Sequence, residues 1–156
     1  MLDENQWLQY GFPRSETEIQ GITLHEVENF ATAEDYEKYL AEVNKSNEAL
    51  HYICDATESR QLMPFNYAVY HTGKGIDWGN SNTIAIGILS SLNNEKFDAS
   101  LDNAVALIKE IQNSYGIDNN HIYFHNSFNK LTYCPKTLLD RYGSVIRFVN
   151  EKIMEK

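Results

Sequence analysis

The sequence predicts a single α/β domain in which a central mixed β-sheet is flanked by α-helices. Three observations predict this fold class. The length of 156 residues suits one domain. Segments with strand-like and helix-like patterns follow one another in the order β α β β β α β α, which is typical of a sheet covered by helices. The apolar run 83–91, TIAIGILSS, has the character of a buried central strand.

The chain is expected to begin with an irregular N-terminal arm of residues 1–20, followed by the folded domain of residues 21–156. This domain opens with a strand, because Ile22 and Leu24 alternate with polar neighbours. His25 has the opposite phase and lies near the end of the same strand.

The first helix is predicted to open at Thr32, a good N-cap residue that is followed by acidic residues in the first turn. Tyr36 and Leu40 have the spacing of an apolar helical stripe. The polar segment 44–48, NKSNE, is expected to end this helix.

The middle of the chain is predicted to contain two strands, in 49–56 and in 61–65. The segment 67–82 that follows contains three glycines and is predicted to be a long loop. Loops of that length in compact domains are usually either functional or disordered, so this one is a candidate for part of a binding site.

The second helix is predicted to be capped by Asp98 or Ser100 and closed by Gly116. Three elements complete the chain, and they are a strand at 121–126, a helix that opens at Pro135, and a last helix at 144–155.

Composition excludes several classes of function. The formal net charge is −9, so a basic surface for nucleic acid or for an anionic membrane is not expected. No segment is long and apolar enough for a membrane helix. The first residues lack the basic and apolar regions of a signal peptide, so the chain is expected to be made in the cytoplasm without one.

Two histidines and one cysteine form a candidate metal site. His25 and His125 each stand at the end of a predicted strand, and the ends of strands in a central sheet converge on one rim. Cys134 follows His125 across a loop. Two imidazoles and a thiolate are ligands that Zn²⁺ favours, and they leave a fourth position open, as in catalytic zinc sites. A cysteine–histidine nucleophile is the alternative, because Cys134 also precedes a helix.

Five segments, taken in order, resemble the type 2 N-acetylmuramoyl-L-alanine amidases, the zinc family that includes phage endolysins and peptidoglycan recognition proteins. The similarity looks closest to the catalytic domains of phage endolysins. It is carried by ITLHEVEN, LHYICDATESRQLMPFNYAVYHTGKG, GNSNTIAIGI, DNAVALIKEIQNSYGI and YFHNSFNKLTYCPKTLLD.

The resemblance implies a zinc amidase-like fold with Zn²⁺ on His25, His125 and Cys134. It implies hydrolysis of the amide between N-acetylmuramic acid and L-alanine in bacterial peptidoglycan. It also implies action at the bacterial cell wall after release, as in a phage or prophage lysin. A separate wall-binding module or a larger lytic assembly is an expected partner.

Two positions depart from the pattern that the resemblance implies. Many relatives carry a general-base glutamate where this chain has Gly87, and a lysine where it has Thr132. His71 and Lys130 are therefore the candidate catalytic residues. The candidate substrate contacts are His51, Trp78, Asn80 and Thr132.

These two departures keep a second function open, namely a peptidoglycan-binding protein with the same fold and little or no catalysis. The complete set of His25, His125 and Cys134 argues against it. A thiol hydrolase is the third alternative, and it differs from a zinc hydrolase in resisting a chelator.

Overall fold

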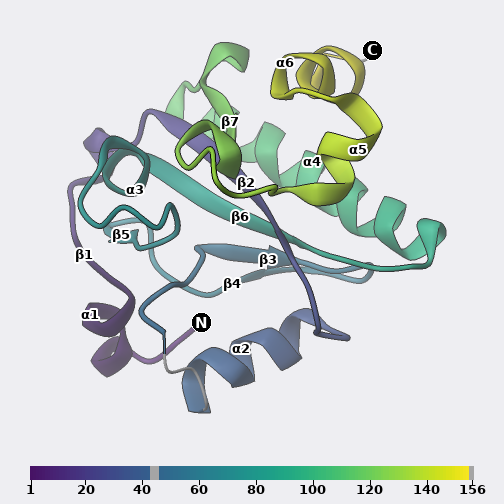
Figure 1. The fold of residues 1–156 in the computed structure, drawn as a ribbon. Coiled ribbons are helices and arrows are strands. Elements are labelled where there is room, and N and C mark those ends of the chain that lie inside the picture. Colours follow the sequence, from purple (N-terminus) through teal and green to yellow (C-terminus); the bar gives the residue numbers. More distant parts are fainter. Residues whose placement is uncertain (43–45, 155–156) are drawn as a thin grey trace.

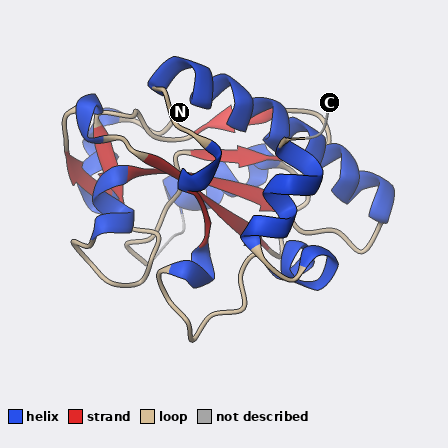
Figure 2. Cartoon of the chain, turned by 90° about the horizontal axis from the view of Figure 1, so that it is seen from above, coloured by secondary structure: helices blue, strands red, loops and turns tan. Residues whose placement is uncertain are grey.

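The computed structural model describes residues 1–42 and 46–154 of the chain. Its centre is a five-stranded sheet with the strand order β4-β3-β6-β2-β7 (Figure 1). The strands are β2 (Gly21–Val27), β3 (Tyr52–Cys54), β4 (Ser59–Gln61), β6 (Thr83–Leu89) and β7 (Ile122–Phe124). Strand β2 is parallel to both β6 and β7, β3 is parallel to β6, and β4 is antiparallel to β3. The predicted mixed sheet with flanking helices is confirmed (Figure 2).

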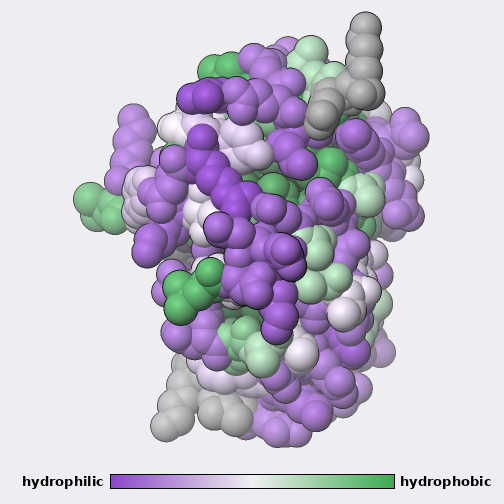
Figure 3. All heavy atoms as spheres, turned by 90° about the vertical axis from the view of Figure 1, so that its right-hand side faces the viewer, coloured by the Kyte–Doolittle hydropathy of each residue, from purple (hydrophilic) through white to green (hydrophobic). Residues whose placement is uncertain are grey.

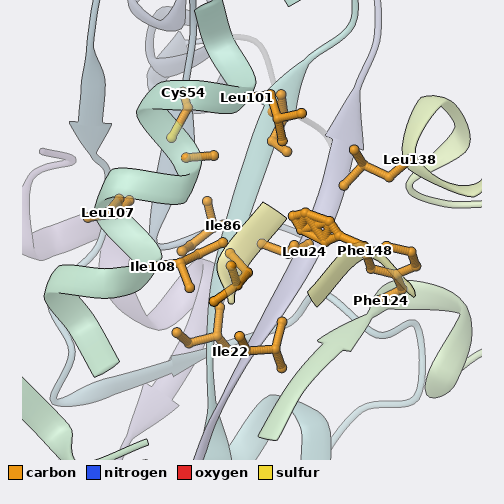
Figure 4. Packing of buried hydrophobic residues seen from close by; sticks show 14 of the residues in the cluster. Ile22, Leu24, Cys54, Ile86, Leu101, Leu107, Ile108, Phe124, Leu138 and Phe148 are labelled. Atoms are coloured by element: carbon orange, nitrogen blue, oxygen red, sulfur yellow. The ribbon is translucent and has the colours of Figure 1, made fainter. Parts of the chain in front are cut away.

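One face of the sheet packs against α4 (Asn94–Tyr115), α5 (Lys136–Tyr142) and α6 (Val145–Phe148). Strand residues of even number point to this face, and Figure 4 shows Ile22, Leu24 and Ile86 beneath Leu101 and Ile108 of α4. The rings of Phe124 and Phe148 lie 5.7 Å apart and join β7 to α6. Nearly all of these side chains are withdrawn from solvent, which makes this the larger core.

The opposite face carries a second core beneath α2 (Ala33–Glu42). It contains Leu50, Ile53 and Ala85 together with the helix residues Tyr36 and Leu40. Strand residues of odd number point to this side, because side chains alternate along a strand. His25 and Gly87 are paired across β2 and β6, so both face this side of the sheet.

The N-terminal segment is more ordered than predicted. Residues Gly11–Pro13 form strand β1, which pairs antiparallel with β5 (Tyr67–Val69) in a second small sheet. Two short helices, η1 (Glu4–Gln6) and α1 (Trp7–Tyr10), precede it, and η2 (Glu16–Glu18) follows. Tyr10 is fully buried, which explains why the segment is held against the domain. The prediction of an irregular arm was therefore wrong for these residues.

The predicted loop 67–82 was also partly wrong, because it contains β5 and the short helix α3 (Trp78–Asn82). The second helix begins earlier than predicted, since Asn93 is its N-cap and its side chain accepts the Lys96 N–H at 3.0 Å. Asp98 and Ser100 therefore lie inside α4. Gly116 closes it in a left-handed conformation, φ 67°, as predicted.

Other boundaries moved by a few residues. The predicted strand at 61–65 is β4, Ser59–Gln61, because it forms a hairpin with β3. The 3₁₀ turns η3 (Asn119–His121) and η4 (His125–Ser127) flank β7. The last helix is α6 followed by a π-helical turn, η5 (Val149–Ile153). The predicted end of the first helix, at 44–48, lies partly outside the described residues. Residue 155, the predicted end of the last helix, lies wholly outside them.

One face of the molecule is largely polar. Figure 3, which faces the right-hand side of Figure 1, shows mostly hydrophilic residues with apolar ones scattered among them. Over the ranges 1–42 and 46–154, no helix combines the length and the apolar character that crossing a bilayer requires.

Gly87 is tightly enclosed. A Cβ atom at this position would lie 2.4 Å from Leu50 Cδ1 and 3.0 Å from Ile53 Cδ1. Gly87→Ala is therefore expected to lower the free energy of unfolding by about 1–3 kcal/mol, as overpacking does, although alanine is the better residue in an ordinary strand. Urea denaturation measures the change. In a Leu50→Ala background the same substitution is expected to cost much less, and an equal cost in both backgrounds would contradict this packing.

Candidate metal centre

His25, His125 and Cys134 lie together at one edge of the sheet. Each offers one ligand atom, and these three atoms all lie within 4.8 Å of one another. His25 is buried, with 6% of its surface exposed, while the other two are half-buried. The three residues that the sequence proposed as ligands are thus gathered at one point.

Parallel strand pairing brings the two histidines together. Strand β2 pairs with β7 in the register Leu24↔Phe124, so the residues that follow these two are neighbours. The imidazole rings of His25 and His125 have centroids 4.4 Å apart. The sheet therefore fixes two of the three groups through its backbone.

Glu26 connects the third group to the sheet. Its backbone N–H donates to Sγ of Cys134 at 3.3 Å, across 108 residues of chain. Its carboxylate accepts the backbone N–H of Thr137 at 2.6 Å and the hydroxyl of Thr137 at 2.8 Å. The hydroxyl of Ser90 donates to the same carboxylate. Strand β2, the end of β6 and the start of α5 are thereby held together around Cys134.

His71 orients His25. Nδ1 of His71 lies 2.9 Å from Nε2 of His25, and Nε2 of His71 lies 3.3 Å from the carbonyl of Gly79. A carbonyl oxygen only accepts, so Nε2 of His71 carries the proton and its Nδ1 is the acceptor. His25 then donates from Nε2, which leaves its Nδ1 unprotonated and available to a metal ion.

His125 is oriented in the same way. Its Nε2 lies 3.4 Å from the carbonyl of Thr72, so this nitrogen is the donor and Nδ1 is unprotonated. Burial lowers the pKa of His25 well below its usual value, and lowers that of His71 to about 3. Burial also lowers the pKa of His125, although the hydrogen bond to Thr72 and the charge of Glu48 both raise it. All three rings are therefore neutral near pH 7, and the candidate ligands His25 and His125 must be neutral to bind a metal ion.

The surroundings of the Cys134 thiol do not favour its thiolate form. Burial raises its pKa to about 11, and the charges of Glu26 and Glu28 act in the same direction against the hydrogen bond from Glu26. A thiol with a raised pKa is a poor nucleophile at neutral pH. A bound cation would ionise it, so this environment suits a metal ligand better than a nucleophile.

The three groups face an open cavity of about 500 Å³. Its lining includes His25, His125 and Cys134, together with Thr132 and Tyr133. A solvent-accessible cavity on one side of the three ligand atoms gives a substrate access to them.

The structure corrects two predicted substrate contacts. His51 is fully buried, its Nδ1 accepts the Ala85 N–H at 2.9 Å, and its Nε2 lies 2.7 Å from the carbonyl of Tyr67. Asn80 is fully buried as well, and its side-chain oxygen accepts the backbone N–H groups of His71 and Thr72. Both side chains stabilise the fold and have no surface for a substrate.

The two predicted catalytic residues differ in their placement. His71 lines the cavity, but it is only 3% exposed and both its nitrogens are engaged, an arrangement that suits positioning of His25, and its catalytic role stays a prediction. Lys130 is exposed on the loop and is absent from the cavity lining. Thr132 does line the cavity. Trp78 is 41% exposed against Tyr123, and its role as a substrate contact stays a prediction.

Glu26 is the site residue that sequence reasoning missed. It follows His25 directly and has the same phase in the strand as the apolar Ile22 and Leu24, where a charged residue needs partners. This position in the strand is the sequence feature from which the role of Glu26 could have been predicted.

Glu26→Gln is expected to lower the free energy of unfolding by about 1.5–3 kcal/mol, the range for hydrogen bonds to charged groups. A glutamine amide presents a donor where Thr137 and Ser90 both donate. Urea denaturation of the metal-free protein measures the loss. Exposed Glu28 is the matched control, and Glu28→Gln should stay within about 0.5 kcal/mol of wild type. Equal stabilities of the two variants would contradict the role given to Glu26.

Known proteins are similar to this chain in sequence and in fold. The N-acetylmuramoyl-L-alanine amidase CwlA of a Bacillus species is 30% identical over 132 residues, which cover 83% of this chain and 51% of CwlA. The chain spans about half the length of the curated relatives it matches, or less.

Solved structures share the fold. The solution structure of the PlyG catalytic domain has a TM-score of 0.85 at 23% identity, and the match covers 100% of this chain and 94% of that one. A mutant endolysin from Bacillus subtilis has a TM-score of 0.78 at 25% identity, covering 93% and 92%.

The sequence profile of the N-acetylmuramoyl-L-alanine amidases matches residues 15–137. The match begins before β2 and ends in α5, so it includes His25, His125 and Cys134 with the strands that hold them. The chain belongs to the N-acetylmuramoyl-L-alanine amidase family.

Proposed function

We propose that this protein hydrolyses the amide between N-acetylmuramic acid and L-alanine in peptidoglycan, with Zn²⁺ held by His25, His125 and Cys134. The observation that carries the proposal is the cluster of these three groups at an open cavity, in a chain of this family.

The donor set fits zinc. Nδ1 of His25 and Nδ1 of His125 are both unprotonated, because the other nitrogen of each ring donates a hydrogen bond. Two imidazole nitrogens and one sulfur suit Zn²⁺ better than Mg²⁺ or Ca²⁺, which prefer oxygen. Three protein ligands are the usual number in catalytic zinc sites, where the remaining position serves water or substrate.

Bound zinc would polarise the scissile carbonyl and lower the pKa of a water molecule. The residues of the chain position the groups that would hold the metal ion. His71 and Thr72 hold the two imidazoles in one orientation, and Glu26 holds the sulfur. This rigidity keeps the reacting groups in place, which is worth several kcal/mol of the barrier in well-oriented reactions.

The proposal extends to the biological role. CwlA is named an N-acetylmuramoyl-L-alanine amidase, and one of the similar structures is an endolysin. We propose that this chain acts on the cell wall after release, as a phage or prophage lysin does. A wall-binding module or a larger lytic assembly would supply attachment to the wall. Trp78 and Thr132 remain proposed substrate contacts, and of these two residues Thr132 lines the cavity.

One observation favours a second candidate, a protein that binds peptidoglycan without cutting it. The side chains of Leu50 and Ile53 occupy the space beside Gly87, so no carboxylate can stand there. Loss of a general base typically costs about 10²–10⁴-fold in rate where it operates.

Purified bacterial cell walls test the proposal. The wild-type protein is expected to carry one zinc ion per chain and to release new N-terminal alanine from the walls, with EDTA abolishing the release. Cys134→Ser should lose most of the zinc and the activity with it, because a hydroxyl is a poor zinc ligand. Stoichiometric zinc without alanine release would leave only the binding protein. Release that survives EDTA would contradict the zinc mechanism.

A further inference from the structure

The segment that follows β5 supports both candidate imidazole ligands. Nδ1 of His71 lies 2.9 Å from Nε2 of His25. The carbonyl oxygen of the next residue, Thr72, lies 3.4 Å from Nε2 of His125. His71 and Thr72 are both buried, and neither belongs to a helix or a strand. Their positions are therefore fixed by contacts other than the hydrogen bonds of a sheet.

The side-chain amide of Asn80 contacts both of these residues. Its oxygen accepts the backbone N–H of His71 at 2.9 Å and the backbone N–H of Thr72 at 3.1 Å. Its nitrogen donates to the carbonyl of Gly75. Asn80 is fully buried, so its amide depends on these partners instead of water. Because only the oxygen can accept, the three partners also fix the orientation of the amide.

The two neighbours of Asn80 complete the support. Asp77, the N-cap of α3, accepts the backbone N–H of Asn80 at 2.7 Å and the hydroxyl of Thr72 at 2.9 Å. The carbonyl of Gly79 lies 3.3 Å from Nε2 of His71. A Cβ atom on Gly79 would lie 2.8 Å from Cγ2 of Thr72, so the absence of a side chain allows this close approach. Helix α3 and its cap thus hold His71 by its backbone and ring, and Thr72 by its backbone and hydroxyl.

Asn80 does not line the cavity, so any effect on the site passes through the residues that it holds. A shift of its amide would move the acceptor of His25 and the acceptor of His125 together. Asn129 also donates to the carbonyl of Thr72, at 3.4 Å, so the position of this oxygen matters to two donors. Outer contacts of this kind orient metal-binding histidines and select the nitrogen that binds the metal.

We propose that Asn80, together with the cap residue Asp77, positions the two candidate imidazole ligands. Through His71 the pair sets the orientation of one ring, and through Thr72 it sets that of the other. Each ring then keeps its proton on Nε2 and its Nδ1 available to a metal ion. This inference rests on the proposed function, because it assigns a purpose to the support of the proposed zinc site.

Two variants and two controls test the inference. Asn80→Ala removes the shared acceptor. Thr72→Val removes only the hydroxyl that Asp77 accepts, and it keeps the inference testable if Asn80→Ala does not fold. Asn82→Ala removes an exposed hydrogen bond of the same helix. Leu107→Ala on α4 creates a cavity in the core on the other face of the sheet, so it controls for a loss of stability alone.

Three quantities are measured for each protein. Competition with a chelator gives the dissociation constant for zinc. The ¹⁵N chemical shifts of the imidazole nitrogens in the metal-free protein, at neutral pH, distinguish protonated from unprotonated nitrogens. Urea denaturation gives the free energy of unfolding, so that variants of similar stability can be compared.

Asn80→Ala is expected to bind zinc about 10–100-fold more weakly, as other losses of outer contacts do. The rings of His25 and His125 in this variant are expected to give signals averaged between the two tautomers. Thr72→Val should lose less affinity and should change the signals of His125 more than those of His25. Both controls should keep the wild-type affinity and the tautomer with the proton on Nε2.

Wild-type affinity or unchanged ring signals in Asn80→Ala would overturn the inference. An equal loss of affinity in Leu107→Ala would also overturn it, because affinity would then only follow stability. If Asn80→Ala does not fold, unchanged affinity and signals in Thr72→Val would overturn it instead. A wild-type protein that binds no zinc would refute the proposed function, and the ring signals of the metal-free proteins would still decide whether Asn80 positions the two imidazoles.

Discussion

The contacts of Glu26 with Cys134 and α5 are the interaction on which the site depends. His25 and His125 are positioned by adjacent parallel strands, so the sheet itself brings them together. Cys134 belongs to no strand. It is held because the backbone of Glu26 donates to its sulfur and the carboxylate of Glu26 accepts both hydrogen bonds from Thr137. One residue next to the first histidine thus helps to fix the position of the cysteine, whose carbonyl also accepts the Asn126 N–H at 3.1 Å.

Burial then sets the chemical state of these groups. The imidazoles of His25 and His71 are withdrawn from water and have lowered pKa values, so they stay neutral. The Cys134 thiol is also withdrawn and has a raised pKa. Neutral imidazoles can bind a metal ion directly, and a bound cation would ionise the thiol, so this environment suits a metal site better than a free nucleophile.

The sequence indicated much of this arrangement. The apolar run of β6 predicted the central strand, and the ends of two strands predicted where the histidines meet. The start of α4 was missed because Asn93, Asp98 and Ser100 are all good caps. Phe97 decides between them, since it is buried one turn before Leu101 and extends the apolar stripe.

The roles of polar side chains within strands and loops were harder to predict from the sequence. His51 and Asn80 were expected to contact a substrate, but both are fully buried and hydrogen-bonded to backbone. A sequence shows that a residue can bond, and it does not show whether the partner is a ligand or the protein's own backbone. The packing around Gly87 could not be predicted from the sequence either, because it depends on how the Leu50 side chain packs against the strand.

X-ray absorption spectroscopy at the zinc edge tests the central claim most directly, because it identifies the atoms bound to the metal. For the wild-type protein loaded with one equivalent of zinc, the account predicts one sulfur neighbour at about 2.3 Å and two imidazole nitrogens at about 2.0–2.1 Å. A shell that contains only nitrogen and oxygen would contradict it, because Cys134 would then lie outside the site that Glu26 is held to complete.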